Sequence, residues 1–131
     1  MGKIISFSNQ KGGVGKTTTC VNMAAYLSRA GKKVLLIDLD PQGNATTGLG
    51  FSKGSLKKSV YNVVIEGEEV KDNVLETELE GLYILPSNID LAGAEVDLVY
   101  KKNRDRVLKA ALEKVKGAYD YILIDCPPSL G

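Results

Sequence analysis

The sequence has no histidine and no tryptophan, and only two of its 131 residues are cysteines. Without histidine, any residue that orients or deprotonates an attacking water must be a carboxylate or an amide. Cys20 and Cys126 are far apart in sequence and form neither a CxxC pair nor another metal-ligand pattern, which argues against a metal held by cysteine. Two isolated cysteines are typical of free thiols in a reducing cytoplasm.

Neither sign of charge is in excess, and no apolar run is long enough to cross a membrane. Seventeen basic and sixteen acidic residues leave a net charge of +1, so no overall field would recruit nucleic acid or anionic lipid to these residues. The N-terminus lacks the basic-then-apolar layout of a signal peptide. With 44% hydrophobic residues, the composition predicts one modest intracellular domain with a real core.

One octad, Lys-Gly-Gly-Val-Gly-Lys-Thr-Thr at positions 11–18, follows the apolar stretch Lys3–Ser8 and precedes a helical pattern. A phosphate-binding loop needs this setting, because glycines let backbone N–H groups converge on an anion, lysine adds charge and a hydroxyl reaches Mg²⁺. The Gly-Lys-Thr at 15–17 fits the general pattern, whereas Gln10 stands where that pattern has glycine. The sequence predicts a variant loop whose nucleotide-binding residues are Gly12, Gly13, Val14, Gly15, Lys16, Thr17 and Thr18.

Short apolar runs alternate with helical patterns along the chain. The runs fit parallel strands covered on both faces, and they are Ile4–Phe7, Val34–Ile37, Leu82–Leu85 and Tyr121–Ile124. Helical spacing is found from Lys16 to about Ala30, after Ser55, after Ser87 or Asn88, and from an Asn103 cap to Gly117. The glycine-rich stretch Asp40–Lys53 predicts a functional loop with a short helical turn. The pattern predicts an α/β fold like that of P-loop NTPases, with a mostly parallel sheet flanked by helices.

Two of the predicted strands end in carboxylates. Asp38 and Asp40 follow one strand and Asp125 follows another, and the carboxyl ends of parallel strands share the sheet edge at which the phosphate loop lies. Each aspartate alone has a plainer interpretation as a turn starter or helix cap. Beside a phosphate loop, however, carboxylates imply Mg²⁺, and we expect Thr17 and Asp125 to hold the ion with Asp38 in the next layer of contacts.

Three residues are candidates for a catalytic role. Lys16 would neutralise the β- and γ-phosphate oxygens, and Asp40, at the mouth of the glycine-rich loop, would orient the attacking water. Lys11 is a second lysine on the outer lip of the loop. It could turn outward to a phosphate bound by another subunit, in the manner of an arginine finger, and so couple nucleotide binding to dimerisation.

These motifs resemble those of a known group. Lys11–Thr18 is similar to the deviant Walker A motif of the ParA/Soj partition ATPases, which are relatives of MinD and the nitrogenase iron protein. Asp38–Asn44 resembles their second motif and first switch, and Leu123–Gly131 resembles their Walker B strand and second switch. The amino-acid sequences of both segments resemble ParA/Soj more than MinD, and the resemblance covers the whole chain.

The resemblance implies a slow MgATP hydrolase that forms an ATP-sandwich dimer. Lys11 would cross the interface, Lys16, Thr17 and Thr18 would hold phosphates and metal, and Asp40 would place the water. The choice of ATP over GTP comes from the resemblance alone. It further implies a cytoplasmic protein that associates with the nucleoid when ATP is bound, binds DNA without sequence preference, and responds to a ParB-type partner during chromosome or plasmid segregation.

Family members run to about double this length, so residues 1–131 are expected to be the N-terminal part of a single ParA-like nucleotide-binding domain. Adenine recognition, the DNA-binding residues and much of the dimer surface would lie in the other half, and a sheet edge would be left exposed. One alternative is a MinD-like membrane-cycling regulator, which needs an amphipathic C-terminal helix; residues 1–131 have none, but the other half could contain one. Others are a nucleotide-binding module without turnover, and an ATP-driven reductase, which is disfavoured because only Cys126 lies near the site.

Overall fold

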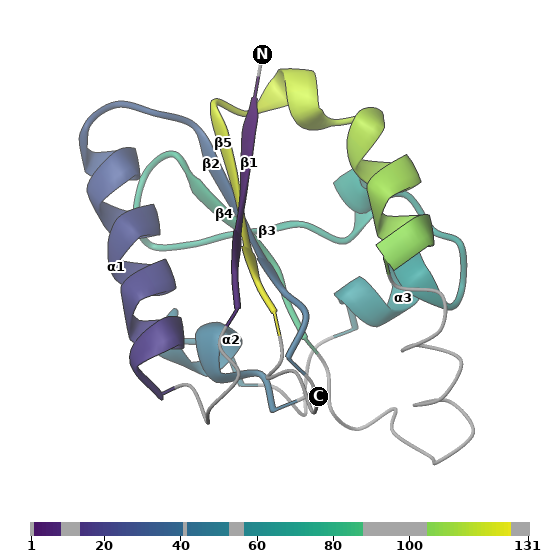
Figure 1. The fold of residues 1–131 in the computed structure, drawn as a ribbon, viewed down its shortest axis with the longest axis horizontal. Coiled ribbons are helices and arrows are strands. Elements are labelled where there is room, and N and C mark those ends of the chain that lie inside the picture. Colours follow the sequence, from purple (N-terminus) through teal and green to yellow (C-terminus); the bar gives the residue numbers. More distant parts are fainter. Residues whose placement is uncertain (1, 9–13, 41, 53–56, 88–104, 127–131) are drawn as a thin grey trace.

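The computed structural model describes residues 2–8, 14–40, 42–52, 57–87 and 105–126. Its centre is a five-stranded sheet in the order β1-β5-β2-β4-β3 (Figure 1). The strands are β1 (Lys3–Phe7), β2 (Val34–Asp38), β3 (Leu75–Glu76), β4 (Leu82–Leu85) and β5 (Tyr121–Asp125). All neighbours pair in parallel except β3, which is antiparallel to β4. The predicted α/β class with a mostly parallel sheet is therefore confirmed.

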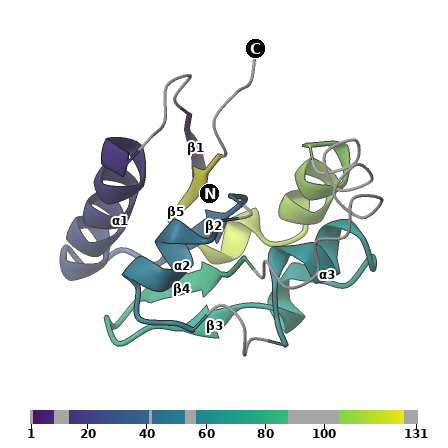
Figure 2. The same ribbon diagram turned by 90° about the horizontal axis from the view of Figure 1, so that it is seen from below.

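Helices cover both faces of this sheet, as the two perpendicular views show (Figures 1 and 2). Helix α1 (Val14–Arg29) lies on one face, while α3 (Val60–Val64) and a helix over residues 105–113 lie on the other. The short helix α2 (Asn44–Gly48) follows the carboxyl end of β2. Two 3₁₀ turns, η2 (Val70–Asp72) and η4 (Lys116–Ala118), complete the described elements.

Strand β2 shows why its residues form a central parallel strand. All five of its residues are buried. Val34 and Leu36 belong to the apolar cluster under α1, whereas Leu35 and Ile37 belong to the cluster under α3 and the 105–113 helix. Because successive side chains of a strand point to opposite faces, a continuous apolar run is what two covered faces require.

The four predicted strands agree with the structure to within one residue at each end. Strand β3 was not predicted, because two residues are too short for an alternating pattern to be recognised. The predicted helix from Lys16 to Ala30 corresponds to α1, and Gly31, the predicted stop, has a left-handed φ of 88°. The short helical turn expected within Asp40–Lys53 is α2.

Two helix boundaries differ from the prediction. The helix expected after Ser55 begins at Val60 and is capped by Ser59, whose hydroxyl accepts a hydrogen bond from the Asn62 N–H at 3.4 Å. The late helix ends at residue 113 and is followed by η4, so it does not continue to Gly117. The expected Asn103 cap and the helix expected after Ser87 or Asn88 lie outside the described residues.

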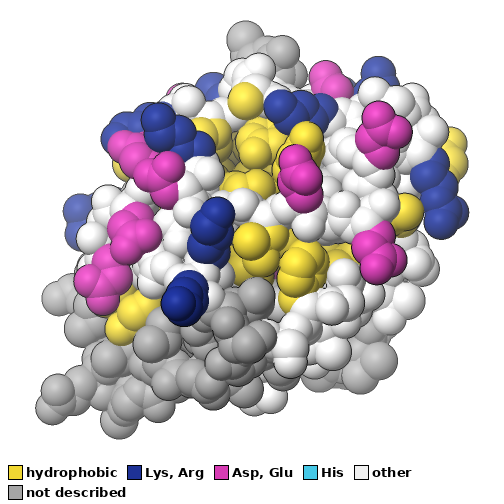
Figure 3. All heavy atoms as spheres, turned by 180° about the vertical axis from the view of Figure 1, so that it is seen from behind, with side chains coloured by type: hydrophobic (Ala, Val, Ile, Leu, Met, Phe, Trp, Pro, Cys, Tyr) yellow, Lys and Arg dark blue, Asp and Glu magenta, His cyan; other side chains and the backbone are white. Residues whose placement is uncertain are grey.

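The edge strands of the sheet are β1 and β3. β1 is an edge strand, and its Ile4 side chain is 44% exposed. On the face drawn in Figure 3, hydrophobic side chains lie among basic and acidic ones, and neither sign of charge forms a continuous patch among the residues that the structure describes. The described residues therefore form no continuous basic surface on that face.

Candidate nucleotide site

The backbone of three strands sets the position of two carboxylates. In the register of the sheet, Asp125 at the end of β5 lies opposite Asp38 of β2 on one side and Phe7 of β1 on the other. The pairing continues beyond the strands, since Leu39 N–H donates to the Asp125 carbonyl at 3.0 Å and Cys126 N–H donates to the Phe7 carbonyl at 2.9 Å. Asp38 and Asp125 are thereby held side by side at the carboxyl edge, as the sequence predicted.

The first turn of α1 brings two side chains to Asp125. Thr17 Oγ1 donates a hydrogen bond to Asp125 Oδ2 at 3.0 Å, and Lys16 Nζ forms an ion pair with Asp125 Oδ1 at 2.5 Å. The same ammonium group also donates to the Cys126 carbonyl. Asp125 is fully buried, and Lys16 and Thr17 are also buried, with 9% and 8% exposed. A buried carboxylate is thus matched to a cation and a hydroxyl from the predicted phosphate loop.

These groups fit a magnesium ion. Asp125 Oδ1 is buried and accepts no hydrogen bond, so its contact with Lys16 is an ion pair without hydrogen-bond alignment. A carboxylate oxygen with an unused lone pair beside a threonine hydroxyl is a donor set that Mg²⁺ uses, with phosphate and water as its further ligands. Among the described residues no three acidic, cysteine or histidine side chains gather as a metal cage. Thr17 and Asp125 would therefore hold the ion together with a bound phosphate.

Asp38 lies behind this pair and is fully buried. Its Oδ2 accepts hydrogen bonds from Thr46 N–H at 2.9 Å and Thr46 Oγ1 at 2.7 Å, and its Oδ1 accepts from Asp40 N–H at 3.1 Å. The pKa of Asp38 is raised to about 7, chiefly by burial and also by the nearby Asp125 charge, against the opposing hydrogen bonds from Thr46 and Asp40.

Asp40 shapes the turn between β2 and α2. Its Oδ1 accepts a hydrogen bond from Gln42 N–H at 2.9 Å, and its carbonyl accepts from Gly43 N–H at 2.8 Å. Gly43 adopts a left-handed φ of 65°, which a side chain would strain. Asp40 is therefore a turn starter, the plainer of its two interpretations, and the carboxylate is only 6% exposed. Its role in orienting water stays a prediction.

The remaining predicted site residues are only partly described. Lys11, Gly12 and Gly13 lie outside the described residues, and Val14 is the first residue of α1. Gly15 and Thr18 are exposed at the same helix end. A cavity of about 350 Å³ lies between α1 and α2, and it is lined by Thr17, Thr18, Val21, Asn22, Asn44 and Gly48. The start of α1 thus borders open space next to the Thr17 hydroxyl.

Sequence reasoning missed Thr46. This residue is fully buried, bonds Asp38 twice and accepts a hydrogen bond from Ser87 N–H at 3.0 Å. Its only signal in the sequence is its place in the helical turn that follows two strand-end aspartates, and nothing in that pattern separates it from Thr47, which is exposed.

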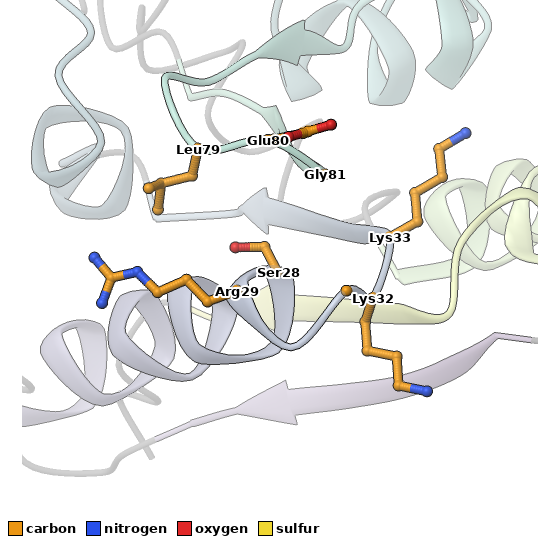
Figure 4. A pocket seen from close by; sticks show the side chains of 8 residues that line it. Ser28, Arg29, Lys32, Lys33, Leu79, Glu80 and Gly81 are labelled. Carbon is orange, nitrogen blue, oxygen red and sulfur yellow. The ribbon is translucent and has the colours of Figure 1, made fainter.

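A second pocket, of about 480 Å³, lies at the opposite end of the sheet, where α1 ends and β2 and β4 begin. Its basic residues are Arg29, Lys32 and Lys33, and their charged ends point away from one another in Figure 4. The Lys33 ammonium instead lies over the rings of Tyr83 and Tyr119, 5.5 Å and 5.3 Å from their centroids. The cations do not converge on a shared ligand, so the candidate site remains the carboxyl edge.

The chain matches the family model described as "AAA domain" over residues 2–131. The chain belongs to this AAA domain family. It is 56% identical to the sporulation initiation inhibitor protein Soj of Bacillus subtilis and 50% identical to the chromosome-partitioning ATPase Soj of Treponema pallidum. Both matches cover 100% of this chain, which spans 52% and 51% of those relatives. The resemblance to ParA/Soj-type ATPases is confirmed, and the chain spans about half the length of the curated relatives it matches.

Solved structures of related proteins have the same fold as this chain. The cobyrinic acid a,c-diamide synthase from Mycobacterium smegmatis, with bound ATP analog and magnesium, is 46% identical and has a TM-score of 0.87, over 100% of this chain and 53% of that one. MinD from Pyrococcus horikoshii, complexed with Mg-ADP, is 35% identical with a TM-score of 0.81, over 100% and 51%. The predicted P-loop ATPase fold is therefore confirmed, and both of these structural neighbours bind nucleotide with magnesium.

Proposed function

We propose that the full-length protein is a partition ATPase that binds and hydrolyses MgATP, dimerises with ATP, and binds DNA without sequence preference to segregate chromosomes or plasmids. The observation that carries the proposal is the contact of Thr17 and Lys16 with the buried Asp125 at the start of α1. The likeness to the Soj relatives supports the partition role, and the ATP-analog and magnesium complex of a structural neighbour supports the ligand.

The nucleotide is held by the start of α1. The N–H groups of Gly12, Gly13, Val14 and Gly15 surround the phosphates, Lys16 neutralises them, and Thr18 adds a hydroxyl. Thr17 and Asp125 hold Mg²⁺, and Asp38 fixes the next layer of contacts. When bound, the ion supplies charge that stabilises the developing phosphate charge. A helix N-terminus favours anions, so the direction of α1 adds to the same binding.

Hydrolysis and assembly use two further residues. Asp40 orients the attacking water from the mouth of the 39–43 turn, a task for which these 131 residues, lacking histidine, offer carboxylates and amides. Lys11 reaches the phosphate held by the other subunit of an ATP-dependent homodimer. A ParB-type partner triggers turnover, and DNA is bound through residues outside this segment. The protein is cytoplasmic, and it associates with the nucleoid when ATP is bound.

A MinD-like membrane-cycling ATPase regulator is the second candidate function, because a MinD structure matches the fold with a TM-score of 0.81. No helix of the described residues is both long and apolar enough to cross a membrane. MinD-like cycling uses an amphipathic helix that lies on the membrane surface and does not span it, so this finding does not distinguish the two functions. An experiment must decide between them. The higher identity to the Soj relatives, at 50% and 56%, favours the partition function.

The deciding experiment measures ATP turnover of the full-length protein alone, with DNA, and with anionic liposomes. We expect DNA, together with a ParB-type partner, to stimulate turnover and liposomes to leave it unchanged. Lys16→Ala should abolish MgATP binding in calorimetry, whereas Arg29→Ala, at the exposed far end of the same helix, should bind like the wild type. Stimulation by liposomes and not by DNA would favour the MinD-like function, and a wild type that binds no nucleotide would refute both.

A further inference from the structure

Thr46 joins three segments that are far apart in the sequence. It lies on α2, its hydroxyl donates to Asp38 at the end of β2, and the same hydroxyl accepts from the N–H of Ser87, which follows β4. Its own N–H donates to the same Asp38 oxygen at 2.9 Å. All three residues are buried, with 0% of Thr46, 0% of Asp38 and 3% of Ser87 exposed.

The two hydrogen bonds of the Thr46 hydroxyl fix the direction of its proton. A threonine hydroxyl has one proton, and because its oxygen accepts from Ser87 N–H, that proton is directed at Asp38. Two donors from Thr46 then fix Asp38 Oδ2, while Asp38 Oδ1 fixes the Asp40 N–H at 3.1 Å. Thr46 thus fixes the rotamer of Asp38, and Asp38 in turn holds the N–H of Asp40 in the turn.

The turn is also tied to the sheet at its first residue, because Leu39 N–H donates to the Asp125 carbonyl at 3.0 Å. Beyond Asp40, it is closed by the Gln42 and Gly43 N–H bonds to Asp40 itself, which are local. The apolar anchor of α2 is the buried Ala45, which packs under α1. Leu49 and Phe51, just after α2, are only partly buried in the same cluster. Leu39 fixes the β2 end of the turn, and the polar bonds of Thr46 to Asp38 and Ser87 hold the α2 end against β2 and β4.

We propose that Thr46 is a positioning residue of the nucleotide site: by binding Asp38 and Ser87 at once, it holds α2 and the Asp40 turn against the ends of β2 and β4 in the arrangement that hydrolysis needs. This inference rests on the proposed ATPase function for its catalytic consequence, and on the contacts alone for its structural part. Thr46 contacts neither Lys16 nor Thr17 in any described interaction, so its effect is exerted through Asp38 and the turn.

The experiment compares three variants of the full-length protein. Thr46→Val keeps the shape and removes the hydroxyl, Thr46→Ser keeps the hydroxyl, and Thr47→Val makes the same change at the exposed neighbour on the same helix. The first readout is amide hydrogen exchange without nucleotide. In Thr46→Val, exchange at Asp40, Thr46 and Ser87 should be faster by about tenfold or more, as expected for the loss of a hydrogen bond to a charged group, with β5 unchanged.

The second readout separates binding from turnover. In Thr46→Val, kcat should fall by about tenfold or more because the turn is misplaced, while the calorimetric Kd for MgATP stays within about threefold of the wild type. Thr46→Ser should recover most of both kcat and exchange protection. Thr47→Val should match the wild type in both.

The following results would overturn the proposal or its catalytic part. Unchanged exchange at Asp40 and Ser87 in Thr46→Val overturns the proposal, whatever the turnover. Exchange that rises equally over β5, or no recovery in Thr46→Ser, shows a general loss of folding and also overturns it. A wild type without ATP binding refutes the proposed function and with it the catalytic part of the inference, while the exchange data still decide whether Thr46 holds the turn.

Discussion

The ammonium group of Lys16 lies 2.5 Å from Asp125 Oδ1, and both side chains are almost wholly buried, with 5% and 0% exposed. Charges removed from water to this degree are tolerated only when they are paired, and the loss of one partner leaves the other uncompensated. The pair joins the first turn of α1 to the central strand β5. Its two members are therefore coupled in stability as well as in the proposed chemistry.

We expect Lys16→Met to lower the free energy of unfolding of the full-length protein by about 3 kcal/mol, because Asp125 is left as a buried unpaired carboxylate. The double variant Lys16→Met with Asp125→Leu should recover most of that loss, since it removes both charges and keeps apolar volume. Urea unfolding of the wild type, both single variants and the double variant completes the cycle. Additive losses in the double variant would show that the two charges do not interact.

The raised pKa of Asp38 predicts a pH dependence of stability. The folded state holds the proton up to about pH 7, whereas a free aspartic acid side chain has a pKa of 3.8. Below about pH 4 both states are protonated and the contribution of Asp38 is complete. As pH rises from there to about 7, the unfolded chain loses its proton first, so stability falls.

Comparison with Asp38→Asn isolates this effect, because the amide does not titrate. The free energy of unfolding of the wild type minus that of Asp38→Asn should fall by on the order of 1 kcal/mol per pH unit between about pH 4 and pH 7, and then level off. Urea unfolding over this range is the measurement. A difference that is flat or rises with pH would mean that the three hydrogen bonds to Asp38 outweigh its burial.

Asn73 organises the segment between α3 and β3. It is 1% exposed, its Oδ1 accepts from Ser59 N–H at 3.2 Å and Asn62 Nδ2 at 2.9 Å, and its Nδ2 donates to Glu68 Oε1 and to the Glu69 carbonyl. Asn73→Ala should lower the free energy of unfolding by about 2 kcal/mol or more, because the buried Ser59 N–H loses its acceptor.

The matched control for Asn73→Ala is Asn22→Ala on the exposed side of α1, which should change stability by less than about 0.5 kcal/mol. Thermal and urea unfolding give both values. Equal effects of the two changes would show that the Asn73 network adds nothing beyond an ordinary surface amide.

The two cysteines should differ in reactivity. Burial, helped by the nearby Asp125 charge, raises the pKa of the Cys20 thiol from 9.0 to about 12, so its thiolate fraction near neutral pH falls about a thousandfold. Cys126 is only half-buried. Iodoacetamide should modify Cys126 in the folded full-length protein and spare Cys20, as read by peptide mass spectrometry. In urea both should react, and fast native modification of Cys20 would contradict its burial on the core-facing side of α1.

The features that sequence reasoning predicted correctly depend on local patterns or on a general property of parallel sheets. The runs at Val34–Ile37 and Tyr121–Ile124 are apolar throughout because both faces are covered, and their trailing aspartates meet because parallel strands end at one edge. The register that places Asp38 opposite Asp125 follows from the same strands.

What was missed depends on contacts between distant residues. Thr46 binds Ser87 across 41 positions, and no periodicity encodes that hydrogen bond. The start of α3 at Val60 is set by Ser59, whose N–H is held by Asn73 fourteen residues later, so the apolar residue Leu56 could not mark the boundary. Helix propensity is a weak local preference, and tertiary hydrogen bonds decided where this helix begins.

Asp40 has a structural and a proposed catalytic role, and two substitutions separate them. Asp40→Asn keeps an oxygen that can accept the Gln42 N–H, now 2.9 Å from Oδ1, whereas Asp40→Ala removes the acceptor. We expect both to bind MgATP and to lose turnover by about 100-fold or more, because neither carries the carboxylate proposed to orient water. Only Asp40→Ala should also lower the free energy of unfolding, by about 1 kcal/mol.

The control is Asp120→Asn, because Asp120 also accepts a backbone N–H, that of Lys33 at 2.8 Å, but lies at the opposite end of the sheet. It should hydrolyse ATP at the wild-type rate in the same assay. If Asp40→Asn also hydrolyses ATP normally, the carboxylate of Asp40 serves only to start the turn, and the residue that orients the water must be sought elsewhere. Because Asp40→Asn preserves the turn acceptor, a loss of turnover in that variant cannot be attributed to a collapsed loop.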